Sequence, residues 1–99
     1  MSDKELLELA AKAAGYSCRI RTTKIGIEKF YINGHVWNPL TDDGDALRLA
    51  VKLNLTVCSG PVYSYVVGCT QEKNNGDHYA ATRRAIVRAA AEIGKWEGE

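Results

Sequence analysis

Apolar residues in the first 15 positions recur every three or four residues, which is the spacing of one helix face. Ser2 and Glu5 have the spacing of a capping box, so their side chains can satisfy free N–H groups at a helix start. Gly15 is typical of the left-handed residue that ends a helix. The pattern predicts a helix between Ser2 and Gly15, whose packed face contains Leu6, Leu9, Ala10 and Ala13.

After this helix the apolar period changes to two, which is typical of half-buried strands. Two strands are expected, at residues 16–23 and 28–32, with a turn between them. Asn33-Gly34 is the strongest short hairpin signal available. It predicts a third strand in which Trp37 lies opposite Phe30.

Two further helices are indicated by their first residues. Thr41 or Asp42 can cap the first of them, and Asn54 is a typical stop. Asp77 can cap the second, which covers residues 79–93 and again has one apolar face.

Between these helices, residues 55–59 and 62–69 have the composition of two strands. Gly60-Pro61 fits a type II′ turn, because only the first central residue of that turn needs a positive φ. This register places Cys58 opposite Tyr63.

The predicted order is α-β-β-β-α-β-β-α, in a single α+β domain over residues 1–99. A polar loop is expected at residues 70–76 and a frayed end at residues 95–99. The strands would form one mostly antiparallel sheet carrying the helices, either on one face or on both as an α/β/α sandwich.

The composition is that of one globular domain: 99 residues, 45% hydrophobic and 25% charged. Thirteen Lys and Arg against 12 Asp and Glu leave a net charge of +1, which argues against nucleic-acid binding driven by bulk charge. No apolar run has the roughly 18 residues of a membrane helix, and the acidic start lacks the basic segment of a secretory signal. Three cysteines without a C-x-x-C spacing predict reduced, mostly buried thiols in a reducing cytosol.

No catalytic motif is present, so we expect a non-enzymatic protein without a metal or cofactor. His35 and His78 stand 43 positions apart with no clustered ligands, which makes a zinc site improbable. The carboxylates of Asp42, Asp43 and Asp45 could hold a hard cation. The EF-hand pattern is missing, however, and helix capping is the favoured role.

Tyr79, Arg83 and Arg84 fall in the first two turns of the last predicted helix. Free N–H groups at a helix start and guanidinium groups together can bind phosphate or carboxylate. Alternatively, both arginines pair with carboxylates of the same chain, Asp43 or Asp45 among them. The sequence leaves both interpretations open.

A second basic group is predicted on the first sheet. Arg19 and Arg21 project from one face of a strand, and Lys29 could join them from its neighbour. Such a stripe could contact nucleic acid, but no aromatic residue interleaves on that face of the first strand. We expect a solvated sheet face.

Residues 37–53, WNPLTDDGDALRLAVKL, resemble a family of small phage and prophage proteins with a phage α-β-α sandwich domain. Residues 80–90, AATRRAIVRAA, resemble the last helix of the same family, and the resemblance covers about residues 6–93. It implies a bacteriophage protein that acts in the cytoplasm of the bacterial host. It brings no established catalytic residues.

Small phage proteins outside the replication and capsid machinery often counter host defence. One device is a sponge: a homo-oligomer that sequesters a signalling nucleotide in pockets at its subunit interfaces. The ligand-binding residues would then be Trp37, Asn38, Tyr79, Arg83 and Arg84. The alternatives are an inhibitor that binds and blocks a host defence protein or complex, and a DNA-associated accessory factor. None of these functions involves a membrane.

Overall fold

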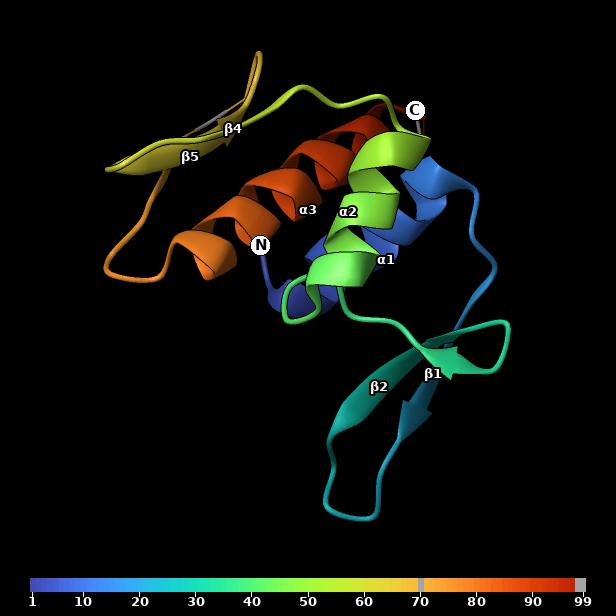
Figure 1. Ribbon diagram of the computed structural model, residues 1–99. Coiled ribbons are helices and arrows are strands. Elements are labelled where there is room, and N and C mark those ends of the chain that lie inside the picture. The colour runs from blue at the N-terminus through green and yellow to red at the C-terminus, as the bar shows by residue number, and fades with distance from the viewer. Residues whose placement is uncertain (70, 98–99) are drawn as a thin grey trace.

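The computed structural model describes residues 1–69 and 71–97. Three helices lie side by side in the middle of the molecule, and two small sheets stand at opposite ends of this helical layer (Figure 1). The helices are α1 (Asp3–Ala14), α2 (Asp43–Lys52) and α3 (His78–Glu97). The α+β class with packed helices is therefore confirmed. Within the described residues, no helix is long and apolar enough to cross a membrane.

All strand pairs are antiparallel, as predicted, but they form two sheets instead of one. The first sheet contains β1 (Cys18–Thr22), β2 (Glu28–Ile32) and β3 (His35–Val36). The second contains β4 (Val57–Ser59), β5 (Tyr63–Val66) and β6 (Glu72–Lys73). The sheets stay apart because α2 follows β3 and packs on α3, so the second hairpin starts at the far end of the helical layer. β6 adds a strand where a loop was expected at residues 70–76.

Local signals in the sequence set most of the helix and turn boundaries. Ser2 accepts a hydrogen bond from the Glu5 N–H at 3.2 Å, which is the first half of the predicted capping box, and the Glu5 carboxylate accepts from the Ser2 hydroxyl in place of the Ser2 backbone N–H. Asp42, one of the two predicted caps, accepts from the N–H at the third helical position of α2. Asn33 and Gly34 have φ values of 52° and 80°, as a two-residue hairpin turn requires.

The hairpin between β4 and β5 turns one residue later than predicted. Cys58 pairs with Tyr65 instead of Tyr63, which makes Pro61 and Val62 the central residues of the turn. A proline has a fixed φ that suits the first central position of a turn, so the chain reverses around Pro61.

The three cysteines are free but differ in their surroundings. Cys18 and Cys58 are half-buried, as expected, whereas Cys69 is exposed. Burial raises the pKa of the Cys18 thiol above its ordinary value, which keeps this group in the unreactive thiol form.

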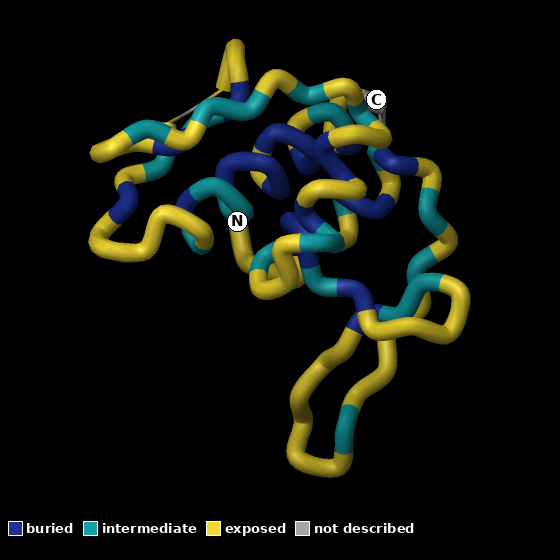
Figure 2. The backbone as a smooth tube through the Cα atoms, viewed as in Figure 1, coloured by how far each residue is buried: buried dark blue, intermediate teal, exposed yellow. Residues whose placement is uncertain are grey.

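The core forms where α1 and α3 pack along each other (Figure 2). Most of its side chains are small, which lets the two helices approach closely and leaves little room for added volume between them. α1 contributes Leu6, Leu7, Ala10, Ala11 and Ala14, and α3 contributes Ile86, Val87, Ala89, Ala90 and Ala91.

α3 continues to Glu97 and not only to Ile93, so residues 95–97 are helical where a frayed end was predicted. Residues 98–99 lie outside the described part of the chain. The helix continues because Gly94 packs against the backbone of α1: a Cβ on Gly94 would overlap the carbonyl oxygen of Leu9. Gly94, a residue type that often ends helices, therefore lies within α3 at a point where α3 packs closely on the backbone of α1.

We predict that Gly94→Ala lowers the free energy of unfolding by about 1–3 kcal/mol or more, because α1 and α3 must move apart to accept the methyl group. Gly44→Ala in α2 is the matched control: only the ends of the Arg48 and Asp42 side chains lie near the new methyl group. It should change stability by less than about 1 kcal/mol, since alanine has the higher helix propensity. Urea unfolding followed by circular dichroism measures both, and equal effects would contradict the packing role of Gly94.

Candidate functional site

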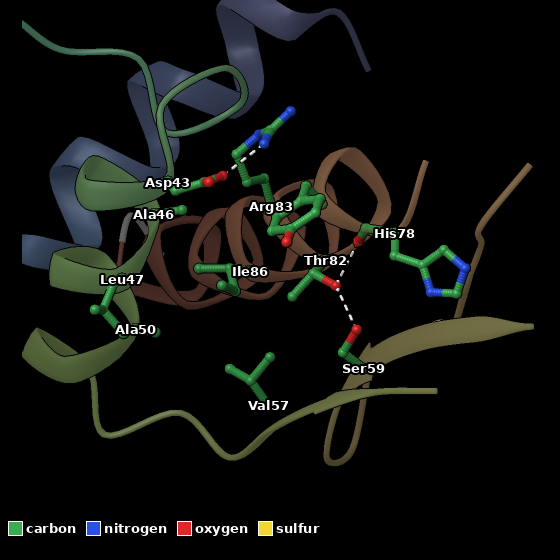
Figure 3. A pocket seen from close by; sticks show the side chains of 11 residues that line it. Asp43, Ala46, Leu47, Ala50, Val57, Ser59, His78, Thr82, Arg83 and Ile86 are labelled. Carbon is green, nitrogen blue, oxygen red and sulfur yellow. Dashed lines mark hydrogen bonds and ion pairs between the residues drawn. The ribbon is translucent and has the colours of Figure 1, made fainter. Parts of the chain in front are cut away.

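A cleft of about 690 Å³ lies between α2, β4 and the first turns of α3 (Figure 3). Its walls are mostly apolar, and its edge carries one ion pair and two hydroxyl groups. The apolar walls come from Ala46, Leu47, Ala50, Val57 and Ile86. The polar edge comes from Asp43, Ser59, Thr82 and Arg83. Both the size and the composition are typical of sites for small molecules.

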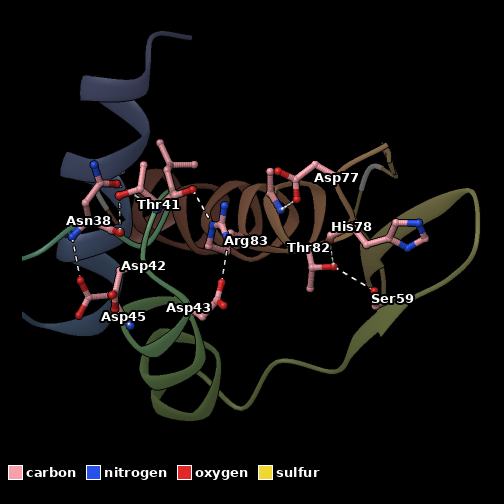
Figure 4. Close-up of polar contacts among 12 residues, drawn as sticks. Asn38, Thr41, Asp42, Asp43, Asp45, Ser59, Asp77, His78, Thr82 and Arg83 are labelled. Carbon is pink, nitrogen blue, oxygen red and sulfur yellow. Dashed lines mark hydrogen bonds and ion pairs between the residues drawn. The ribbon is translucent and has the colours of Figure 1, made fainter. Parts of the chain in front are cut away.

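Arg83 joins three elements at one end of the cleft (Figure 4). Its Nε donates to the carbonyl of Leu40 at 2.8 Å, and its Nη1 contacts the carboxylate of Asp43 at 2.6 Å. Only 17% of the Arg83 side chain is exposed, so the guanidinium is held firmly in this position. The internal pairing that the sequence allowed for Arg83 is therefore present, with Asp43 as its partner.

Arg84 lies one step further around α3 and faces away from this pair. Its Nη1 contacts the carboxylate of Asp3 at the start of α1, at 3.2 Å. Successive helix positions differ by about 100° in direction, so the two arginines contact different elements. Arg84 does not line the cleft, and neither predicted partner, Asp43 or Asp45, binds it.

Trp37 and Asn38 also lie outside the cleft. Trp37 is 6% exposed and packs edge-on against Tyr16, with ring centroids 5.9 Å apart. The Asn38 N–H donates to Asp45 at 3.0 Å, and its side-chain oxygen accepts from the Leu40 N–H. Both residues line a separate hollow between α1 and β2.

The mouth of the cleft is marked by large exposed apolar side chains. Tyr79 is 70% exposed and lines the cleft on the α3 side. Leu47 lines it from α2, and Val51 follows one turn later on the same helix, at exposed fractions of 63% and 67%. Of the five residues predicted to bind a ligand, only Tyr79 and Arg83 are brought together here.

The polar side of the cleft is supported by a buried hydrogen-bond network that the sequence analysis missed. The Thr82 hydroxyl lies 3.1 Å from that of Ser59 and 3.0 Å from that of Ser64, and also donates to the carbonyl of His78. Ser64 is fully buried and donates to Asn74, which in turn donates to the carbonyl of Gly60. The visible signal was the alternation of Ser64 and Val66 with tyrosines along β5, which places a polar residue on the inner face.

His78 belongs to this network and also lines the cleft. Its Nδ1 lies 3.3 Å from the Asn74 amide nitrogen, and the ring points away from Ser59 and Thr82 (Figure 3). The hydroxyls of Ser59 and Thr82 and the side chain of His78 therefore all lie on the polar side of the cleft, with the imidazole ring directed away from the two hydroxyls.

The three carboxylates at the start of α2 are used by the fold (Figure 4). Asp42 caps the helix, Asp43 pairs with Arg83, and Asp45 pairs with Arg48 at 2.7 Å. In the chain from residue 1 to 69 and 71 to 97, no group of His, Cys, Asp and Glu side chains is arranged to hold a metal ion.

Comparisons of the chain with protein-family models, with curated proteins and with solved structures found no match. The resemblance to phage proteins therefore rests on residues 37–53 and 80–90 of the sequence.

We predict that Arg83→Ala lowers the free energy of unfolding by about 1–2 kcal/mol, because the Leu40 carbonyl and Asp43 both lose a charged donor. Arg84→Ala removes only an exposed ion pair and should lower it by less than about 1 kcal/mol. Chemical unfolding of both variants checks the difference, and a larger loss for Arg84→Ala would contradict these assignments.

Proposed function

We propose that this chain is a non-enzymatic binding protein whose cleft takes a small nucleotide-like ligand. The observation that carries the proposal is the division of the cleft into apolar walls and a polar edge with one arginine. A nucleobase is flat and largely apolar on its faces, while its sugar and phosphate are polar and anionic. Both halves of such a ligand have a matching surface here.

In this proposal the base lies against the apolar wall of α2 and under the ring of Tyr79. The hydroxyls of Ser59 and Thr82 lie within reach of the polar atoms on the base or sugar. The phosphate approaches Arg83, whose Nη2 makes no hydrogen bond within the described residues. Asp43 holds the same guanidinium and competes with the phosphate.

The biological setting follows from the resemblance. We take the protein to be a phage product that counters host defence in the bacterial cytoplasm by sequestering a nucleotide signal. The open mouth of the cleft supports a homo-oligomer, because a second copy would cover Leu47, Val51 and Tyr79 together with the bound ligand.

Titration with a panel of linear and cyclic mono- and dinucleotides by calorimetry tests the proposal. Tyr79→Ala should lower the affinity for the panel member that binds by roughly tenfold, because it removes the ring over the base. Tyr63→Ala is the matched control, since Tyr63 is also exposed but lies on β5 outside the cleft. If no nucleotide of the panel binds, or both variants lose affinity equally, the cleft is not a nucleotide site.

Asp43→Asn should raise the affinity for a nucleotide about fivefold and leave the affinity for the matching nucleoside unchanged. The substitution removes the carboxylate that competes with phosphate for Arg83, and an ion pair whose carboxylate is exposed to solvent contributes about 1 kcal/mol. The same calorimetric titration with nucleotide and nucleoside separates the two ligands. An equal gain for both would place the phosphate away from Arg83.

A protein-blocking function is the second candidate, and the exposed apolar row of Leu47 and Val51 favours it. In this alternative, Leu47 and Val51 contact a helix of a host defence protein, instead of being covered by a second copy of the chain over a bound nucleotide. Light scattering discriminates between the two candidate functions. A sponge with pockets at its subunit interfaces requires a mass at least twice 10.9 kDa, whereas a blocker can be a monomer.

A further inference from the structure

The first sheet projects from the helical layer and is exposed along most of its length (Figures 1 and 2). Its strand register places Arg19 opposite Tyr31 and Arg21 opposite Lys29. Because neighbouring positions of a strand face opposite sides, these four side chains share one face, while Ile20 and Phe30 share the other. Phe30 is buried, so the face with the cations is the outer one.

The outer face is positive although the whole chain is nearly neutral. Residues 17–36 contain four lysines and arginines and one carboxylate, that of Glu28. Glu28 pairs with Lys4 of α1 at 3.1 Å. The ion pairs among the described residues include none with Arg19, Arg21 or Lys29.

The pairing of Arg21 with Lys29 is unfavourable for folding, because like charges directly opposite each other in a sheet destabilise it. Nothing within the described chain neutralises this pair. A bound polyanion would do so.

Tyr31 supplies an aromatic ring in the middle of the cations. The Arg21 guanidinium lies 5.5 Å from the centre of the Tyr31 ring, and Arg19 lies opposite Tyr31 in the adjacent strand. Beside them is a hollow of about 320 Å³, lined in part by Arg19, Arg21, Tyr31 and Asn33. β1 has no aromatic residue on this face, but Tyr31 of the neighbouring strand β2 provides the aromatic ring that a nucleic-acid surface needs.

We propose that the outer face of the β1–β2–β3 sheet binds single-stranded nucleic acid. Arg19, Arg21 and Lys29 contact successive phosphates, and an unstacked base packs in the hollow against Tyr31. A duplex keeps its bases stacked and offers Tyr31 no base face, so the single strand is favoured. This surface is separate from the cleft, and its function does not depend on the ligand proposed there.

The first test uses fluorescein-labelled decamers of uridine and of thymidine, with a ten-base-pair duplex for comparison, in anisotropy titrations. Stacking and phosphate contacts need no sugar hydroxyl, so both decamers should bind, and more tightly than the duplex. With three phosphate contacts, the logarithm of the affinity should fall with the logarithm of salt at a slope of about −2. Equal or tighter binding of the duplex, or no binding of either decamer in 50 mM salt, overturns the proposal.

The second test replaces Tyr31. Tyr31→Ala should weaken decamer binding roughly 5- to 150-fold, as expected for the loss of one stacking ring. Tyr31→Phe keeps the ring and should bind within about threefold of the unchanged protein. If Tyr31→Ala binds normally, the ring has no part in recognition and the proposal fails.

The third test separates binding from folding. Lys29→Glu replaces a like-charge pair with an opposite-charge pair across from Arg21, so it should raise the midpoint of thermal unfolding by about 2–8 °C. The same change should lower decamer affinity at least tenfold. Lys73→Glu is the charge-matched control on the second sheet, at β6, and should leave affinity within about threefold. Equal losses in the two variants would mean that only net charge matters, which overturns a local site.

Discussion

The close contact between α1 and α3 is the constraint on which the rest of this structure depends. Alanines line the facing sides, and at Gly94 the two backbones touch. Because small side chains bury little area each, this contact is stabilising only when the helices lie at close range along their whole length. The direction of α3 is thereby fixed, and α3 packs against α1, α2 and all three strands of the second sheet.

The cleft is a consequence of how α2 and the second sheet meet α3. At the α2 end, Arg83 binds the loop at Leu40 and the helix start at Asp43. At the sheet end, Thr82 binds the hydroxyls of Ser59 and Ser64. Thr82 and Arg83 are adjacent in α3, and they hold the second sheet and α2 on different sides of this helix. The space between α2 and the second sheet has apolar walls because both elements turn apolar side chains towards α3.

The sequence was most informative where a structure is decided by a few neighbouring residues. The Ser2 cap, the Asp42 cap and the Asn33-Gly34 turn were predictable because each is a local hydrogen-bond or φ requirement. The continuation of the last helix beyond residue 93 was missed for the opposite reason: it depends on the contact of Gly94 with Leu9, 85 positions earlier in the chain.

The candidate site shows the same limit. Spacing along the last helix correctly gathered Tyr79 and Arg83, which are four apart and lie on one face. It could not show that Arg84 meets Asp3, or that Trp37 packs edge-on against Tyr16, since those contacts join distant segments. Side-chain types therefore indicated the chemistry that was available, whereas tertiary packing decided which groups remained for a ligand.

Net charge was the least informative number, because it averages over surfaces that are charged in different ways. The cleft pairs its only arginine with an aspartate, which suits a ligand with a large apolar part. The first sheet keeps three cations on one face without an acidic partner among the described residues and places two of them directly opposite each other. Since such an arrangement lowers the stability of the sheet, its presence is better explained by what it can bind than by what it contributes to folding.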